Sequence, residues 1–233
     1  MLEVRRLNAG YGRAQILFDL DLDAGPGEIV VLLGRNGAGK STALKSIIGL
    51  VRPISGEIWF AGKRIDHLQP FQIARLGIGY VPEDRRIFTD LTVAENLEVG
   101  RQSARSDAAH WTSERLFRLF PSLGELRSRL GAHMSGGEQQ MLTIARTLMG
   151  NPRAILLDEP SEGLAPLIVQ QMARTVLELK REGLTVLLCE QNLHFAQTVA
   201  DRAFIIEKGH VRYSGAMRAL EADAVLREQY LAL

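Results

Sequence analysis

Apolar and polar residues alternate along the first part of the chain. From residue 2 to residue 33 the period is two, most clearly in 16–22, and this period is typical of half-buried strands. Turn residues at 8–10 and 25–27 are expected to separate these strands. Residues 29–33 are apolar throughout, which indicates a strand buried on both faces.

The pattern between residues 55 and 82 predicts two more strands with a helix between them. Residues 55–62 and 77–82 are strand-like, and 66–76 has the character of a short helix. A charged loop follows the second strand. Loops at strand ends are where open α/β sheets place their ligand contacts.

The hydrophobic period changes between about Thr92 and Gly150. Strand signals vanish, and apolar residues in 116–130 recur at helical spacing. Residues 102–110 are polar and small, which predicts a loop or a frayed helix end. We therefore expect an all-helical lobe, residues 92–150, inserted between strands of a core formed by 1–91 and 151–233.

Strand-like runs return after the lobe, so the fold class is α/β. A helix is expected to begin at Pro166 and to end at Gly183, because proline favours a first helical turn and glycine a helix end. A hairpin at 208–209 and a short amphipathic C-terminal helix complete the chain. The three apolar runs are 154–157, 185–189 and 203–206.

Composition and charge limit the class of protein. The 233 residues, 46% hydrophobic and 24% charged, suffice for one domain with a sub-lobe. The formal net charge is +1, so the charge of a dedicated nucleic-acid binder is absent. Cys189 is the single cysteine, which excludes an internal disulfide and suits a reducing compartment. No apolar segment approaches the roughly 20 residues of a membrane span.

A glycine-rich loop joins the buried strand 29–33 to a predicted helix over 43–48. Its glycines allow successive N–H groups to point at an anion, and the helix adds the positive end of its dipole. Lys40 can reach the β- and γ-phosphates of a nucleotide, and the Ser41 hydroxyl can ligate Mg²⁺. Strand, helix, lysine and hydroxyl together favour a phosphate site over an ordinary turn. The loop consists of Gly34, Arg35, Asn36, Gly37, Ala38, Gly39, Lys40, Ser41 and Thr42.

Two carboxylates, Asp158 and Glu159, close the apolar strand 154–157. Burying both without partners would be costly. Beside a phosphate loop they can divide two tasks, because Asp158 can hold the shell of Mg²⁺ and Glu159 can orient and polarise the attacking water. An isolated pair would indicate only a polar strand end, but the complete phosphate loop upstream favours catalysis.

A second candidate anion site begins the predicted helix near residue 136. Ser135, Gly136, Gly137 and Glu138 form a Ser-x-x-Glu pattern, which by itself is a capping box that starts a helix. The paired glycines exceed what a cap needs, and they expose N–H groups at the positive end of the helix dipole. Two phosphate-binding sites are therefore predicted on different lobes.

Tyr11 lies in the turn region ahead of the phosphate loop. Its ring could stack on a base or simply pack against the protein. The residue type and position leave both roles open.

These motifs together resemble the ATP-binding-cassette (ABC) family over essentially the whole chain. The signature is 134–140 and the Walker B strand is 155–159. The resemblance implies a P-loop NTPase core sheet with an N-terminal antiparallel β subdomain and an inserted helical lobe. It also implies ATP and Mg²⁺ as cofactors and a head-to-tail pair of cassettes, in which each ATP lies between the P-loop of one and the signature of the other. Tyr11 becomes a candidate for adenine stacking.

Finer motifs resemble the smaller ATP-binding subunit of branched-chain amino-acid importers. That likeness implies a peripheral ATPase on the cytoplasmic face of a membrane. Its partners would be a second cassette (a sister chain or another copy), permease subunits and, indirectly, an extracytoplasmic solute-binding protein, with no nucleic acid. Urea and short-amide importers share nearly all of these motifs, so the solute stays open. The motifs are 77–83, 91–97, 158–166 and 189–192.

Three positions depart from the wider family pattern. Glu83 stands where a glutamine is usual, which would bring an anion near Mg²⁺ and the γ-phosphate. Pro166 replaces an aspartate, and Gln191 occupies the usual position of the switch histidine, whereas His194 is interpreted as a helix residue. Gln191 and Glu83 leave open a nucleotide-binding module without activity. A soluble cassette ATPase acting on DNA or ribosomes is a separate alternative.

Overall fold

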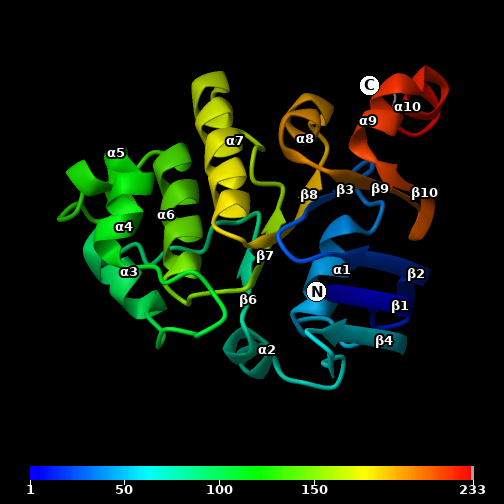
Figure 1. The fold of residues 1–233 in the computed structure, drawn as a ribbon, viewed down its shortest axis with the longest axis horizontal. Coiled ribbons are helices and arrows are strands. Elements are labelled where there is room, and N and C mark those ends of the chain that lie inside the picture. The colour runs from blue at the N-terminus through cyan, green and yellow to red at the C-terminus, as the bar shows by residue number, and fades with distance from the viewer. Residues whose placement is uncertain (232–233) are drawn as a thin grey trace.

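Ten strands form two sheets in the computed structural model, which describes residues 1–231 (Figure 1). The first sheet is antiparallel, in the order β2-β1-β4-β5. The second has the order β10-β9-β3-β8-β7-β6 and is parallel except for β10. The strands are β1 Leu2–Tyr11, β2 Ala14–Ala24, β3 Ile29–Leu33, β4 Ser55–Phe60, β5 Lys63–Arg64, β6 Ile78–Val81, β7 Ala154–Asp158, β8 Thr185–Glu190, β9 Arg202–Glu207 and β10 His210–Ala216.

Helices dominate the region between β6 and β7, as the change of period predicts. An isolated bridge between Thr92 and Leu130 is the one β-pairing recorded there among the described residues. No helix within residues 1–231 has the length and apolar character needed to cross a membrane. The α-helices are α1 Lys40–Ile47, α2 Pro70–Leu76, α3 Val93–Gly100, α4 Ser113–Leu119, α5 Pro121–Glu125, α6 Gly136–Leu148, α7 Pro166–Arg181, α8 Leu193–Val199, α9 Met217–Ala222 and α10 Ala224–Leu231.

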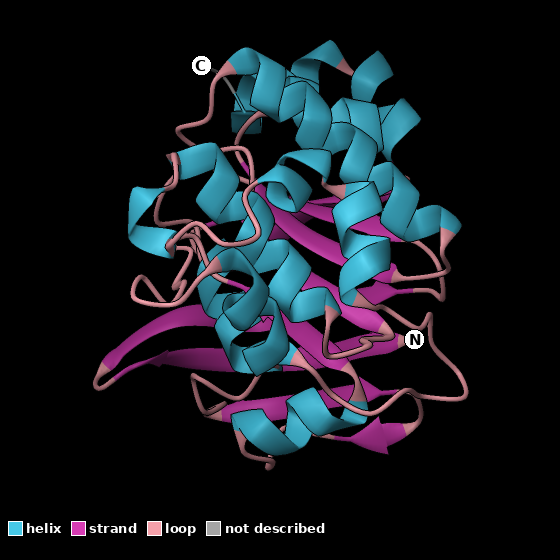
Figure 2. Ribbon diagram, turned by 90° about the vertical axis from the view of Figure 1, so that its left-hand side faces the viewer, coloured by secondary structure: helices cyan, strands magenta, loops and turns pink. Residues whose placement is uncertain are grey.

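Two hydrophobic clusters lie on opposite faces of the core sheet. One joins α1 to both sheets, so that this helix lies between them (Figure 1). The other joins the opposite face of the core sheet to α6, α7, α8 and the smaller helices. Figure 2 views the molecule from the side of α3–α6, whose helices lie in front of the strands. The core sheet thus carries α1 on one face and the helical region on the other.

The turn predicted at residues 8–10 is wrong, because β1 continues to Tyr11. Ala9 pairs with Leu17 in β2, and the register shifts around it allow the strand to continue through polar and glycine residues. A Cβ atom at Gly10 would lie 2.1 Å from the carbonyl oxygen of Ala14. Glycine serves the close approach of two strands here, not a reversal of the chain.

Two predicted helices have different bounds in the structure. The helix expected over 66–76 begins only at Pro70, where a capping box with Gln69 and Gln72 starts it. The C-terminal helix is two helices, because the Asp223 carboxylate accepts a hydrogen bond from Leu226 N at 2.9 Å and starts α10. The helix expected from Pro166 and the hairpin at 208–209 are confirmed.

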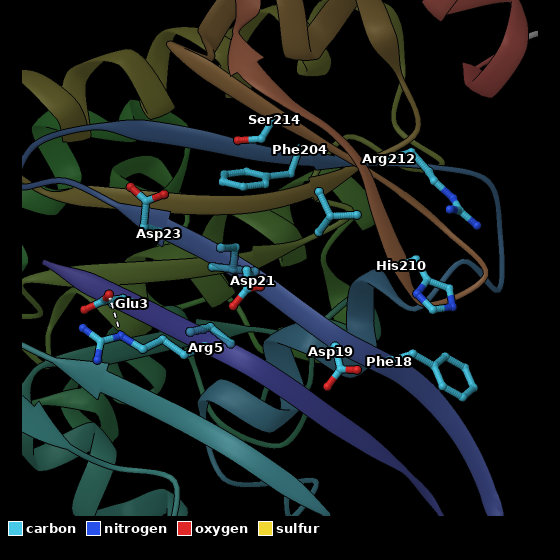
Figure 3. Close-up of a pocket in the computed structure, with 13 residues that line it drawn as sticks. Glu3, Arg5, Phe18, Asp19, Asp21, Asp23, Phe204, His210, Arg212 and Ser214 are labelled. Carbon is cyan, nitrogen blue, oxygen red and sulfur yellow. Dashed lines mark hydrogen bonds and ion pairs between the residues drawn. The ribbon is translucent and has the colours of Figure 1, made fainter.

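The edges of the two sheets meet beside a groove of about 590 Å³ between β2 and β10 (Figure 3). Phe18 N donates to Gly209 O at 3.0 Å, and the Phe18 ring stacks on His210 with centroids 5.1 Å apart. Asp19, Asp21 and Asp23 line the groove. None of its lining residues belongs to the predicted phosphate site.

Candidate functional site

The predicted phosphate loop connects β3 to α1, and two of its glycines cannot be replaced without a clash. Gly34 has φ 156°, and a Cβ atom there would lie 2.3 Å from the carbonyl oxygen of Ile206. Gly39 has φ 112°, and its Cβ would lie 2.7 Å from Leu17. Gly39 also precedes α1 without a side-chain cap. The helix therefore starts at the loop, as an anion site requires.

The Lys40 ammonium is buried within this loop. Its Nζ donates to the carbonyl oxygens of Gly34 at 2.9 Å and Arg35 at 3.3 Å. It also lies 3.1 Å from Oε1 of Glu159, and only 3% of Lys40 is exposed. The carboxylate therefore balances the charge of the buried lysine.

Asp158 joins the loop to the core sheet through two hydroxyl groups. The Ser41 hydroxyl donates to Oδ1 at 2.8 Å, and the Tyr80 hydroxyl donates to Oδ2 at 3.0 Å. Burial raises the pKa of Asp158, while these two hydrogen bonds oppose the rise. Tyr80 was not among the predicted site residues. The strand that carries Tyr80 is predicted by the sequence, but nothing in the sequence indicates that β6 lies directly beside β7.

Ser41 and Asp158 fit a Mg²⁺ ion because both present hard oxygen atoms side by side. Within residues 1–231 no group of three or more His, Cys, Asp or Glu side chains could hold a metal. Mg²⁺ commonly uses one or two protein ligands and takes the rest from phosphates and water. The pair Ser41 and Asp158 is compatible with a Mg²⁺ ion that takes its other ligands from phosphates and water.

Glu159 has a left-handed backbone, with φ 47°. Such a conformation costs of order 1–3 kcal/mol and is held here by a hydrogen bond from Glu159 N to Cys189 O at 3.1 Å. Gln191 Nε2 donates to Glu159 Oε2 at 2.8 Å and also to Asn36 Oδ1. The two predicted catalytic residues thus lie together, next to the phosphate loop, and His194 lies in α8 as expected.

A second glutamate, Glu162, shares a hydrogen bond with Glu159. The hydrogen bond between Glu162 and Glu159, aided by burial and by the charges of Glu159 and Glu83, raises the pKa of Glu162 to about 7. Burial alone would raise the pKa of Glu159, but the bond from Glu162 and the charge of Lys40 hold it below its ordinary value. Of the two carboxyl groups, Glu162 is therefore the one that takes up a proton first, and Glu159 is ionised at neutral pH.

Glu190 is a further site residue that the sequence analysis did not single out. It is 2% exposed, and its carboxylate accepts hydrogen bonds from three backbone N–H groups. The donors are Ser161 at 3.1 Å, Gln191 at 3.2 Å and Asn192 at 3.2 Å. Glu190 thus ties the loop after β7 to the end of β8 and fixes the backbone of Gln191. A charged residue that ends an apolar strand is the one signal the sequence offers for it.

Two predicted residues lie at the margins of the site. Glu83 is exposed and lines a small cavity of about 200 Å³ together with Lys45, Tyr80 and Asp158. Tyr11 ends β1 with 49% of its surface exposed. Both positions leave the side chain accessible to a ligand.

The second predicted anion site lies at the start of α6. Ser135 N donates to Glu138 Oε2 at 2.7 Å, and Glu138 N donates to Ser135 Oγ at 3.4 Å, so the capping box is present. A Cβ at Gly137 would lie 3.0 Å from the side chain of Ile168 in α7. These residues are not part of the network that joins the P-loop to Asp158 and Glu159.

A family model described as ABC transporter matches residues 17–162. The chain belongs to the ABC transporter family. It is similar to BraG of Pseudomonas aeruginosa, a high-affinity branched-chain amino acid transport ATP-binding protein, with 42% identity over 99% of both chains. It is also similar to LptB of Haemophilus influenzae, a lipopolysaccharide export system ATP-binding protein, with 34% identity over 99% of this chain and 97% of LptB.

Solved cassettes share the fold. An ATP-binding subunit of an ABC transporter aligns with TM-score 0.82 and 32% identity, over 99% of this chain and 96% of that chain. A dimeric bacterial ABC transporter cassette aligns with TM-score 0.79 and 26% identity, over 94% and 99%. The predicted family and fold are confirmed, and this cassette is an ATP-hydrolysing transporter subunit.

Proposed function

We propose that this cassette powers the import of branched-chain amino acids from the cytoplasmic face of a membrane. The proposal is based on the full-length likeness to BraG. The sequence identity to BraG is 42%, which exceeds the 34% identity to LptB. The motifs at 77–83 and 158–166, which resemble those of branched-chain amino-acid importers, also support the proposal. Because fold does not specify a solute, the solute rests on this likeness.

Purification of the cassette from membranes tests the proposal. We expect permease subunits and a second cassette to co-purify, and leucine-loaded solute-binding protein to raise ATP hydrolysis by the complex. Urea at the same concentration serves as the comparison solute. Co-purification with a lipopolysaccharide-exporting permease would reject import.

Hydrolysis at this site would begin from the ion pair between Lys40 and Glu159. When phosphate enters the loop, Lys40 has an anion of greater charge to bind than the carboxylate. Release of Lys40 frees Oε1 of the ionised Glu159 to accept a hydrogen bond from water. The lysine thus balances Glu159 before ATP binds and balances the phosphates afterwards.

Mg²⁺ would be held by Ser41 and Asp158. Glu83, which lines a cavity together with Asp158, would act on the water shell of the ion. The ion would neutralise charge on the transferring phosphoryl group. Tyr80 orients the Asp158 carboxylate through its own hydrogen bond.

A second cassette would complete each site with its signature residues. Ser135, Gly136 and Gly137 would face the nucleotide of the partner, because a helix N-terminus such as the start of α6 favours an anion. The likeness to a dimeric cassette supports such pairing. The partner is another copy or a sister chain.

Replacing Gln191 by alanine should lower turnover about tenfold or more, with little change in ATP affinity. The Gln191 amide donates hydrogen bonds to the side chains of Glu159 and Asn36. Neither of these two bonds is to the backbone of the phosphate loop, so loss of the amide should affect hydrolysis more than ATP binding. The measurement is steady-state phosphate release beside an ATP-binding titration. Gln191→His should keep activity and acquire a pH dependence near the imidazole pKa of about 6.5. His194→Ala is the control, and inactivity of that variant would place the switch in α8.

Tyr11→Ala should weaken ATP and GTP binding to a similar extent. Loss of stacking is expected to cost about 1–3 kcal/mol, because stacking on an aromatic ring tolerates any base. Tyr11→Phe keeps the ring and should bind as the unmodified chain does. Unaltered affinity in Tyr11→Ala would make this tyrosine a packing residue only.

The permease is expected to bind a groove of about 650 Å³ between the core and the helical lobe. Four large apolar side chains lining it are exposed, Leu50 (52%), Phe71 (58%), Phe88 (47%) and Val99 (54%). Exposed apolar patches of this kind mark interaction sites. Phe88 and Val99 also follow on Glu83, which lines a cavity together with Asp158 of the candidate site.

Cross-linking locates this contact. A cysteine at Val99 should react with cysteines in the cytoplasmic loops of the permease, whereas one at Val225 on α10 should not. Val225 is 72% exposed and therefore accessible to a cross-linker, while the native Cys189 is buried. Cross-links from position 225 alone would assign the permease to the C-terminal helices.

A further inference from the structure

The guanidinium of Arg85 lies against the first residue of α6. A Cβ atom at Gly136 would lie 2.6 Å from its Nη1 and 3.3 Å from its Cζ. Arg85 is half-buried, so this is a packed position and not a side chain extended into solvent. The glycine of the signature therefore leaves room for a cation as well as exposing its N–H group.

The backbone that carries Arg85 is strained and is held by α6 itself. Arg85 and Arg86 both have left-handed backbones, with φ 61° and 50°, an uncommon conformation for two successive residues with side chains. The Thr143 hydroxyl donates to Arg85 O at 2.8 Å, and Arg146 Nη2 donates to Arg86 O at 2.6 Å. The turn is thus fixed to the helix at whose start the guanidinium lies.

No carboxylate within residues 1–231 pairs with Arg85, whereas the neighbouring Arg86 pairs with Asp84 at 2.7 Å. The nearest acid of α6, Glu138, bonds back to Ser135 N. A helix N-terminus carries partial positive charge and disfavours a nearby cation. Guanidinium and helix end are therefore both electropositive, and an anion between them would stabilise both.

We propose that Arg85 contacts the γ-phosphate of the ATP bound to the partner cassette, beside Ser135 and the N–H groups of Gly136 and Gly137. This inference rests on the proposed head-to-tail pairing. A planar guanidinium donates two parallel hydrogen bonds to phosphate oxygens, which gives charge and geometry together. Because ADP lacks the γ-phosphate, loss of that group removes the contact and weakens the pair. Arg85 thereby makes pairing depend on the third phosphate.

The test uses Glu159→Gln chains, which are expected to bind ATP without hydrolysing it. Arg85→Ala should raise the dissociation constant of the ATP-dependent pair about 10- to 100-fold in sedimentation experiments, as expected for a lost hydrogen bond to a charged group. The ATP affinity of the unpaired chain, measured at high dilution, should change less than twofold. Arg85→Lys keeps the positive charge but cannot donate two parallel hydrogen bonds, so it should pair better than Arg85→Ala and less well than the parent.

Arg118→Ala is the matched control, because Arg118 is exposed on α4 and forms no ion pair within the described chain. It should pair as the Glu159→Gln parent does. If the parent and Arg85→Ala pair equally well, the proposed contact is wrong. It is also wrong if Arg85→Ala weakens ATP binding by the unpaired chain as much as it weakens pairing, because Arg85 would then act on the ATP of its own chain. If the parent itself does not pair with ATP, the proposed function and the contact between cassettes fail together.

Discussion

Glu159→Gln should reduce ATP turnover by at least about a hundredfold while leaving ATP binding in place. The amide keeps the size of the side chain but cannot take up charge from the attacking water, and a general base commonly contributes 10²- to 10⁴-fold. In the resting site the carboxylate is ionised and pairs with Lys40 at 3.1 Å. Phosphate release and nucleotide binding, measured on the same preparation, separate the two effects.

The matched control is Glu125→Gln, which changes an exposed carboxylate at the end of α5. It should hydrolyse ATP at the rate of the unmodified chain. Glu159→Gln should also accumulate as an ATP-bound pair, since ATP would persist. Unchanged hydrolysis in Glu159→Gln would remove this residue from the mechanism.

Glu190→Ala should cost about 3–5 kcal/mol of folding free energy and most of the activity. The substitution leaves three backbone N–H groups without an acceptor in a site that is 2% exposed, and each such group costs about 1–3 kcal/mol. Turnover falls with stability because the backbones of Ser161 and Gln191 lose their common anchor. For a chain of this size the midpoint of thermal unfolding should fall by roughly 6–20 °C.

Calorimetry and phosphate release on the same samples check this expectation. Glu228→Ala, an exposed change on α10, should leave both quantities within error of the unmodified chain. Glu190→Gln keeps one acceptor oxygen but turns an N–H group toward other donors. Its stability and turnover should therefore lie between those of Glu190→Ala and Glu228→Ala. A Glu190→Ala chain as stable as the control would mean that water replaces the carboxylate.

Much of the site could be predicted from the sequence because its parts are local. The strand, glycine loop and helix around residues 29–48 are consecutive, and the period of the apolar residues defines each element. Asp158 follows its own apolar strand and therefore emerges at the same edge. The antiparallel sheet, the core sheet and the helical region also agree with the expected architecture, while the boundaries at 92 and 150 stay a prediction.

Tyr80 and Glu190 could not be predicted because their roles depend on which strands are neighbours. The core order β8-β7-β6 brings the ends of three parallel strands to one edge, but a sequence does not specify that order. The turn predicted around Gly10 is wrong for a related reason. A glycine favours the prediction of a turn when the strand that packs closely against it is unknown.

Transport by reconstituted vesicles shows directly whether this cassette powers import of branched-chain amino acids. The cassette, its co-purifying permease and the second cassette are placed in proteoliposomes with a leucine-loaded binding protein on one side and ATP on the other. Labelled leucine should accumulate in the vesicles only when ATP is present, ATP hydrolysis should rise when leucine is supplied, and Glu159→Gln should abolish both. Hydrolysis that ignores branched-chain amino acids, yet rises when lipopolysaccharide is supplied, would contradict this proposed function.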